Sequence, residues 1–130
     1  MGDAFKIKTE ESRGCLVTRL AGEIDLSNAS DLEQHLTDLV AKKPVVVDLA
    51  LVTFMDSTAL SALVAAYHRA AGAGTSIRLA AAGGSVRKVL DLTQLTTLLD
   101  HHDQVRDAVE AALATSQGED SDQPADSLES

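Results

Sequence analysis

Hydrophobic residues recur with two different periods along the chain. Residues 5–8 and 16–20 alternate between apolar and polar side chains, and Gly14 lies between the two runs. A period of two with one polar face is typical of half-exposed strands. The two runs therefore predict a hairpin that turns near Gly14.

Apolar residues at helical spacing predict four helices. The first follows a polar turn, 22–28, whose last residues are good helix N-caps, and it ends near Lys42-Lys43-Pro44. The second stops at Gly72-Ala73-Gly74, because glycine is a common helix terminator. The third begins at Gly83-Gly84-Ser85, and the fourth covers residues 105–113.

Strands are predicted between these helices. The β-branched run from Pro44 to Phe54 has few polar breaks and predicts a strand that is buried on both faces. Residues 75–82 predict a short strand, and Leu98-Leu99 predicts a brief one. Alternating strands and helices imply βαβ units with right-handed crossovers. We expect an α/β fold, with a small mixed sheet of about four to five strands packed with about four helices.

Length and charge restrict the domain organisation and the partners. The 130 residues suit one domain, which we expect to cover residues 1–114. Residues 115–130 contain five acids and no Lys or Arg, so we expect a disordered acidic tail. The net charge of −9 repels phosphate backbones and anionic lipid headgroups, and aromatic residues that could stack on bases make up only 2%. We expect neither nucleic acid nor a membrane as a partner.

Cysteine usage and hydropathy predict the compartment. Cys15 is the only cysteine, so no intrachain disulfide is possible, and we interpret it as a small buried core residue. The N-terminus lacks the apolar stretch of a signal peptide, and no run approaches the roughly 20 apolar residues that span a bilayer. These features predict a cytoplasmic protein.

Catalytic and metal-binding sequence patterns are missing. Metal-ligand spacing is not found among the four histidines, His35, His68, His101 and His102, which we expect to be surface residues. Gly83-Gly84-Ser85 is best explained as a tight strand–helix turn, because the chain contains neither GxGxxG nor GxxxxGK[ST]. Ser57 does not lie in a GxSxG elbow. We expect no enzyme activity, no metal and no cofactor.

Ser57 lies where the predicted buried strand meets the second helix. A serine at such a junction is an ordinary N-cap, but Asp56 could fill that role equally well and leave the Ser57 hydroxyl pointing outward. A phosphate on Ser57 would add about −1.5 to −2 charge near the positive end of the helix dipole. Such a group would cost the fold little and would act on whatever docks at this corner.

The residues around Ser57 resemble a family signature. The segment Asp48-Leu49-x-x-Val52-x-Phe54-Met55-Asp56-Ser57-Thr58-x-Leu60 is similar to that of STAS domains, specifically the bacterial anti-sigma factor antagonists. Two further segments support the resemblance, Leu20-x-Gly22-Glu23-Ile24-Asp25 and Val86-x-x-Val89-Leu90-x-Leu92-x-x-Leu95. The similarity covers residues 5–113 with every element in family order.

The resemblance implies a phosphorylation switch. Unphosphorylated antagonists of this family bind an anti-sigma factor and thereby release a sigma factor for transcription. The anti-sigma factor is usually a serine kinase of the GHKL type, which supplies the ATP site, and a PP2C-like phosphatase removes the phosphate. On this resemblance Ser57 is the phosphoacceptor, Asp56 and Thr58 flank it in the partner contact, and Asp25 lies on a neighbouring loop that helps to dock the kinase.

Three positions depart from the family pattern, and one alternative function stays open. Ala59, Ser61 and Gln94 stand where the family commonly has glycine. The alternative is a soluble STAS subunit of a lipid or anion transport system, which would act without phosphorylation. The intact Asp56-Ser57 pair favours the antagonist.

Overall fold

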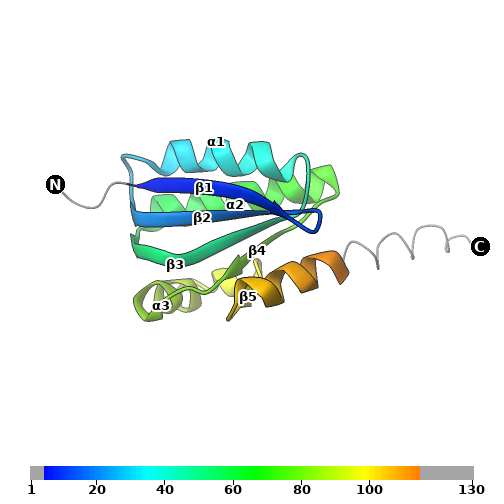
Figure 1. Ribbon diagram of the computed structural model, residues 1–130. Coiled ribbons are helices and arrows are strands. Elements are labelled where there is room, and N and C mark those ends of the chain that lie inside the picture. Colours follow the sequence, from blue (N-terminus) through cyan, green and yellow to red (C-terminus); the bar gives the residue numbers. More distant parts are fainter. Residues whose placement is uncertain (1–4, 115–130) are drawn as a thin grey trace, which may run out of the picture.

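Five strands form one mixed sheet in which the order of the strands follows the order of the chain (Figure 1). The computed structural model describes residues 5–114, and the predicted acidic tail over residues 115–130 lies outside the described residues. The strands are β1 (Lys6–Ser12), β2 (Cys15–Ile24), β3 (Val45–Met55), β4 (Ile77–Ala80) and β5 (His101–His102). β1 pairs antiparallel with β2, and every later strand pairs parallel with the strand before it.

The hairpin between β1 and β2 turns where the sequence predicts it. Ser12 pairs with Cys15, so only Arg13 and Gly14 form the turn. Both have positive φ angles, 57° for Arg13 and 92° for Gly14. Two residues with positive φ match the right-handed twist of the flanking strands, and glycine adopts that conformation without a steric cost.

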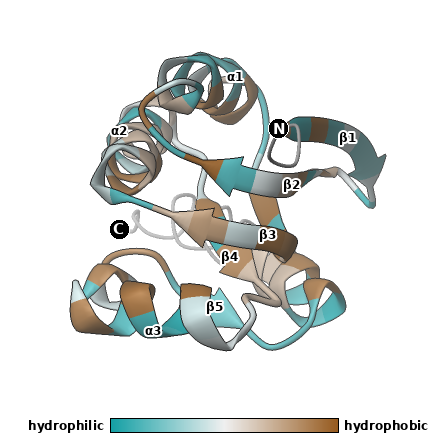
Figure 2. Cartoon of the chain, turned by 90° about the vertical axis from the view of Figure 1, so that its left-hand side faces the viewer, coloured by the Kyte–Doolittle hydropathy of each residue, from teal (hydrophilic) through white to brown (hydrophobic). Residues whose placement is uncertain are grey.

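Helices cover the two faces of the sheet unequally. α1 (Ala29–Val40) and α2 (Ser57–Ala73) lie on one face, and α3 (Gly84–Leu92) and the short 3₁₀ helix η1 (Leu95–Thr97) contribute to the same core (Figures 1 and 2). A further helix over residues 105–114 packs on the opposite face. Its small core consists of Cys15, Val46, Ala80, Ala108, Val109 and Ala112.

β3 is buried on both faces only in its first half. Residues 45–49 are buried, as predicted, because helices lie above and below them. Beyond that point Leu51 is 56% exposed and Phe54 is 48% exposed. The prediction of a strand that is buried throughout is therefore wrong for its second half, where the core around helix 105–114 does not reach.

The connection from β4 to the last helix differs from the prediction. No strand forms at Leu98-Leu99, because Leu95–Thr97 is a 3₁₀ helix that turns Leu99 into the core. The strand is instead the His101–His102 pair, which the sequence placed on a loop. Backbone groups create this strand, since Leu79 N–H donates to the Asp100 carbonyl and Ala81 N–H to the His102 carbonyl, each at 2.9 Å.

The length and hydropathy of the helices were compared with what a membrane-spanning helix needs. Among residues 5–114, none of the helices combines the length and the apolar character that a membrane crossing requires.

Candidate functional site

The carboxyl ends of β2 and β3 meet at one edge of the sheet, which faces the viewer in Figure 2. Ile24 pairs with Met55 at the ends of the two strands, and the Asp56 N–H donates to the Ile24 carbonyl at 3.2 Å. Asp25 and Asp56, the next residues of the two chain segments, are thus brought to the same edge. Functional groups of parallel sheets gather at this edge, because the loops after the strands meet there.

Asp56 is the N-cap of α2. Its Oδ1 accepts hydrogen bonds from the Thr58 N–H at 2.9 Å, from the Ala59 N–H at 3.4 Å and from the Thr58 hydroxyl. These bonds satisfy backbone donors that the first turn of a helix otherwise leaves without a partner. The choice between Asp56 and Ser57, which the sequence left open, is decided for Asp56.

Ser57 is the first residue of α2, and its side chain is exposed. Within residues 5–114 the Ser57 hydroxyl makes no hydrogen bond, because Asp56 already performs the capping. The hydroxyl of the next residue, Thr58, is instead bonded to Asp56. Of these two neighbouring hydroxyls, only that of Thr58 has a hydrogen-bond partner among the described residues.

The Asp56 carboxylate keeps its charge over a wide pH range. The hydrogen bond from the Thr58 hydroxyl is the largest cause that lowers the pKa of Asp56 below its usual 3.8. Desolvation, the second-largest effect, opposes this shift, and the backbone N–H groups of Thr58 and Ala59 lower the pKa further. Asp56 therefore places a fixed negative charge beside Ser57 at neutral pH.

The Asp25 loop is held by side chains that turn back on it. Asp25 Oδ1 accepts from the Ser27 N–H at 3.0 Å and from the Ser27 hydroxyl at 2.6 Å. Asn28 Oδ1 accepts from the Asp25 N–H at 3.1 Å, and Asn28 Nδ2 donates to the Glu23 carbonyl at 2.9 Å. Asn28 stands at the N-cap position of α1, but its side chain makes no capping bond there. The residue predicted as a cap is therefore used to fix the loop.

A shallow groove of about 400 Å³ runs beside Ser57. Its lining residues are Ser57, Leu60, Ser61 and Val64 from α2, and Thr93 and Leu95 from the turn after α3. The sequence predicted Leu60 and Val64 as inward helix positions and did not predict the groove. Only the contact between α2 and a segment about thirty residues further along the chain creates it, and helical spacing carries no information on that contact.

The turn that forms the far wall of the groove is strained. Gln94 has a φ of 62°, in the left-handed region that glycine adopts readily and other residues rarely do. This conformation gives a physical reason for the glycine that the family commonly has here. A side chain of full size is thus held at the rim, between the two groove residues Thr93 and Leu95.

Three large hydrophobic side chains near these elements face solvent. Leu26 in the loop after β2 is 79% exposed, Phe54 at the end of β3 is 48% exposed, and Leu92 at the end of α3 is 74% exposed. Large apolar side chains of this kind supply contact area when a partner protein covers them. The sequence did not predict the exposure of these side chains. The signal that could have indicated it is the polar neighbour that each of them has in the chain.

Other candidate chemistry is separate from this edge. Among residues 5–114, no group of three or more His, Cys, Asp or Glu side chains could hold a metal ion. Cys15 is fully buried, as predicted, and desolvation raises the pKa of its thiol. The histidines differ from the prediction of surface residues, because His35, His101 and His102 are half-buried and only His68 is exposed.

Comparison with known proteins identifies the family. The sequence model of the STAS domain family matches residues 6–112 of this chain. The chain belongs to the STAS domain family. The predicted resemblance and the predicted STAS-like fold are thus confirmed, and the site described above lies within the matched part of the STAS domain.

Several relatives of this STAS domain protein are named for one function. RsfB of Mycobacterium tuberculosis, named an anti-sigma-F factor antagonist, is 30% identical over 95 residues, which are 72% of this chain and 77% of RsfB. An anti-sigma factor antagonist from Mycobacterium paratuberculosis is 31% identical, with a TM-score of 0.76 over 84% of this chain and 94% of that one.

The antagonist SpoIIAA shares the fold at lower identity. Its unphosphorylated form is 18% identical, with a TM-score of 0.70 over 85% of this chain and 97% of that one. The phosphorylated form from Bacillus has a TM-score of 0.62 at 18% identity, over 83% of this chain and 98% of that one. SpoIIAA is thus known in both an unphosphorylated and a phosphorylated form.

Proposed function

We propose that this STAS domain protein is an anti-sigma factor antagonist whose partner binding is switched by phosphorylation of Ser57. The observation that carries the proposal is the free, exposed Ser57 hydroxyl beside a helix cap that Asp56 supplies. The names of the relatives support the same function. The protein acts as a cytoplasmic regulator and not as an enzyme.

In the unphosphorylated state, the edge around Ser57 binds an anti-sigma factor and so releases a sigma factor. The apolar lining of the groove and the exposed Leu26, Phe54 and Leu92 supply contact area. Asp25, Asp56 and Thr58 place polar groups around that area, and the loop bonds to Asp25 hold its carboxylate in place before the partner arrives. The partner is a GHKL-type serine kinase.

The partner kinase transfers phosphate to the Ser57 hydroxyl, and the ATP site belongs to the kinase. Phosphate adds about −1.5 to −2 charge next to the anionic Asp56, at a groove whose apolar lining consists of Leu60, Val64 and Leu95. The partner then binds less tightly, because the phosphate charge does not complement its surface and the phosphate must lose hydration water on binding. The N-terminus of α2 tolerates the anion, because its partial positive charge faces the phosphate. A PP2C-like phosphatase restores the binding form.

The test is phosphorylation of the purified protein by a GHKL-type anti-sigma factor of the same organism with ATP. We expect one phosphate in the intact mass, and we expect Ser57→Ala to abolish it. Ser61→Ala is the matched control, since Ser61 is also an exposed serine on α2, one turn further along the same groove. It should be phosphorylated like the wild type.

Two results would count against the proposal. Phosphate on Ser57→Ala would place the switch at another residue. An unchanged mass with every GHKL-type kinase of the organism, together with stable co-purification of a transporter ATPase, would favour the alternative STAS subunit of a transport system.

A further inference from the structure

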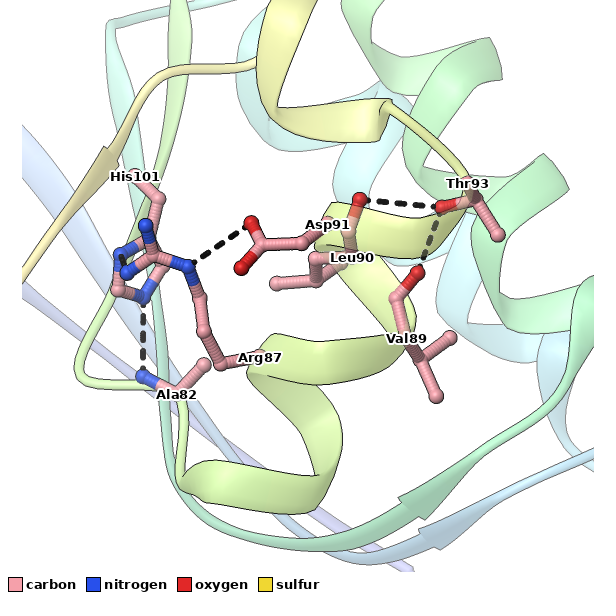
Figure 3. A network of polar contacts seen from close by, with 7 residues as sticks. All are labelled: Ala82, Arg87, Val89, Leu90, Asp91, Thr93 and His101. Atoms are coloured by element: carbon pink, nitrogen blue, oxygen red, sulfur yellow. Dashed lines mark hydrogen bonds and ion pairs between the residues drawn. The ribbon is translucent and has the colours of Figure 1, made fainter.

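His101 lies between two hydrogen-bond donors on the far side of α3 from the groove (Figure 3). Its Nε2 accepts from the Ala82 N–H at 3.1 Å, in the loop between β4 and α3. Its Nδ1 is 2.8 Å from Nη1 of Arg87, on the first turns of α3. Arg87 Nε also donates to Asp91 at 3.1 Å, so the guanidinium is held in place.

The two neighbours of the imidazole cannot accept a proton. A backbone N–H and a guanidinium group only donate hydrogen bonds, so each can be satisfied only by a nitrogen that carries no proton. A neutral imidazole has one nitrogen without a proton. Depending on the tautomer, that nitrogen is Nε2, which accepts from the Ala82 N–H, or Nδ1, which accepts from Arg87. A protonated imidazole has no such nitrogen, and its charge then repels that of Arg87.

The surrounding charges do not remove this conflict. Desolvation is the largest cause that lowers the pKa of His101 below 6.5, followed by Arg87. His102 acts in the same direction, while Asp103 and Asp91 raise the pKa. Asp91 is already bonded to Arg87. The charged and titratable groups around His101 and its strand are Arg87 and Asp91 from α3, Asp100, His102 and Asp103 beside it in the chain, and Arg78 from β4, which donates to Asp100 at 2.9 Å.

The contacts of His101 hold α3 to the sheet at its start. The loop before α3 contains Ala81 with a φ of 62°, a conformation that needs such support from its surroundings. α3 in turn carries Val86 and Val89, which line a small cleft of about 80 Å³ with Phe54. The turn after α3 forms the far wall of the Ser57 groove.

We propose that His101 is an acid-sensitive contact that holds α3 and its preceding loop against the sheet only while the imidazole is neutral. On protonation the Ala82 bond is lost, Arg87 is repelled, and α3 loosens from its N-terminal end. Because α3 leads into one wall of the groove, acid then weakens partner binding, a consequence that rests on the proposed function.

The direction of the pH effect follows from the lowered pKa. His101 in the folded protein binds a proton less readily than in the unfolded chain, so its contact stabilises the fold fully above about pH 6.5. That contribution falls as the pH drops below this value, and it is lost once the pH is below the folded pKa.

The test compares α3 at about pH 7.5 and about pH 5.5, on either side of the usual histidine pKa. Amide hydrogen exchange, corrected for the intrinsic pH dependence, should become severalfold faster in α3 at the lower pH, up to about tenfold, which is the most that one histidine with an unfolded pKa of about 6.5 can supply over this interval. In an NMR pH titration, the Ala82 amide resonance should shift with the same apparent pKa as the ring-nitrogen resonances of His101. His101→Gln keeps an acceptor for Ala82 but does not titrate, so it should remove both responses.

His35→Gln is the matched control. His35 is half-buried, and desolvation also lowers its pKa, but it lies on α1 against Thr9 of β1. This variant should keep the α3 response of the wild type. Equal α3 exchange at both pH values, or the same acid response in His101→Gln, would overturn the proposal. These measurements need no anti-sigma factor, so they succeed or fail independently of the proposed function.

Discussion

Ser27 and Ser57 are two exposed serines at the same edge of the sheet, and each lies within two residues of an aspartate. The Ser27 hydroxyl is bonded to Asp25 at 2.6 Å, whereas the Ser57 hydroxyl has no partner among residues 5–114. The difference arises because Asp56 caps α2 and leaves Ser57 free, while Asp25 turns toward its own loop. The comparison teaches that exposure alone does not distinguish the two serines, whereas their local hydrogen bonding does.

The largest expected effect is on partner binding by Ser57→Glu. The carboxylate places a charge at the groove, and we expect the affinity for the anti-sigma factor to fall at least about tenfold, measured by titration calorimetry. The free energy of unfolding should hardly change, because an anion suits a helix N-terminus. A large loss of stability would mean that Ser57 has a structural role like that of Ser27.

A second expected effect separates the two helix starts. Asp56→Ala removes the cap of α2, so the amides of Thr58 and Ala59 should exchange with solvent much faster in NMR hydrogen exchange. Asn28→Ala should instead loosen residues 23–28 and leave the first turn of α1 unchanged, because Asn28 makes no capping bond. Faster exchange throughout α1 in Asn28→Ala would remove the distinction.

The smallest expected effect concerns the two hydroxyls themselves. Ser27→Ala loses the bond to Asp25 and should cost about 0.5–1 kcal/mol of unfolding free energy in urea denaturation. Ser57→Ala loses no bond and gains helix propensity, so its stability should equal or slightly exceed that of the wild type. Equal losses in both variants would show that the Ser57 hydroxyl is engaged after all.

The elements of the fold were largely predictable from the sequence, and so was the junction at Ser57. Periodicity located the hairpin, the long strand and the helices, because burial on one face leaves a regular pattern. It misplaced the last strand, since apolar Leu98-Leu99 resembles a strand more than His101–His102 does. Backbone groups pair the two histidines with β4, so the histidine side chains carry no sequence pattern that would predict this strand.

The sequence predicted where in the chain the candidate site lies, but it did not predict the groove that forms beside it. The motif around Asp56 and Ser57 indicated the candidate serine, yet the groove depends on Leu95 meeting α2 across the fold. The cap was also ambiguous, because aspartate and serine are both good caps and only the backbone path decides between them. Long-range packing and the choice between equivalent partners are the parts that local patterns do not encode.

The strand order has a consequence for how this domain is built during synthesis. From β2 onward, each strand pairs with the strand made just before it, so the sheet can grow at one edge as the chain emerges. Ser57 and its cap are complete once α2 has formed. The opposite wall of the groove arrives with the last third of the chain, so the α2 wall that carries Ser57 forms first and the groove is completed afterwards.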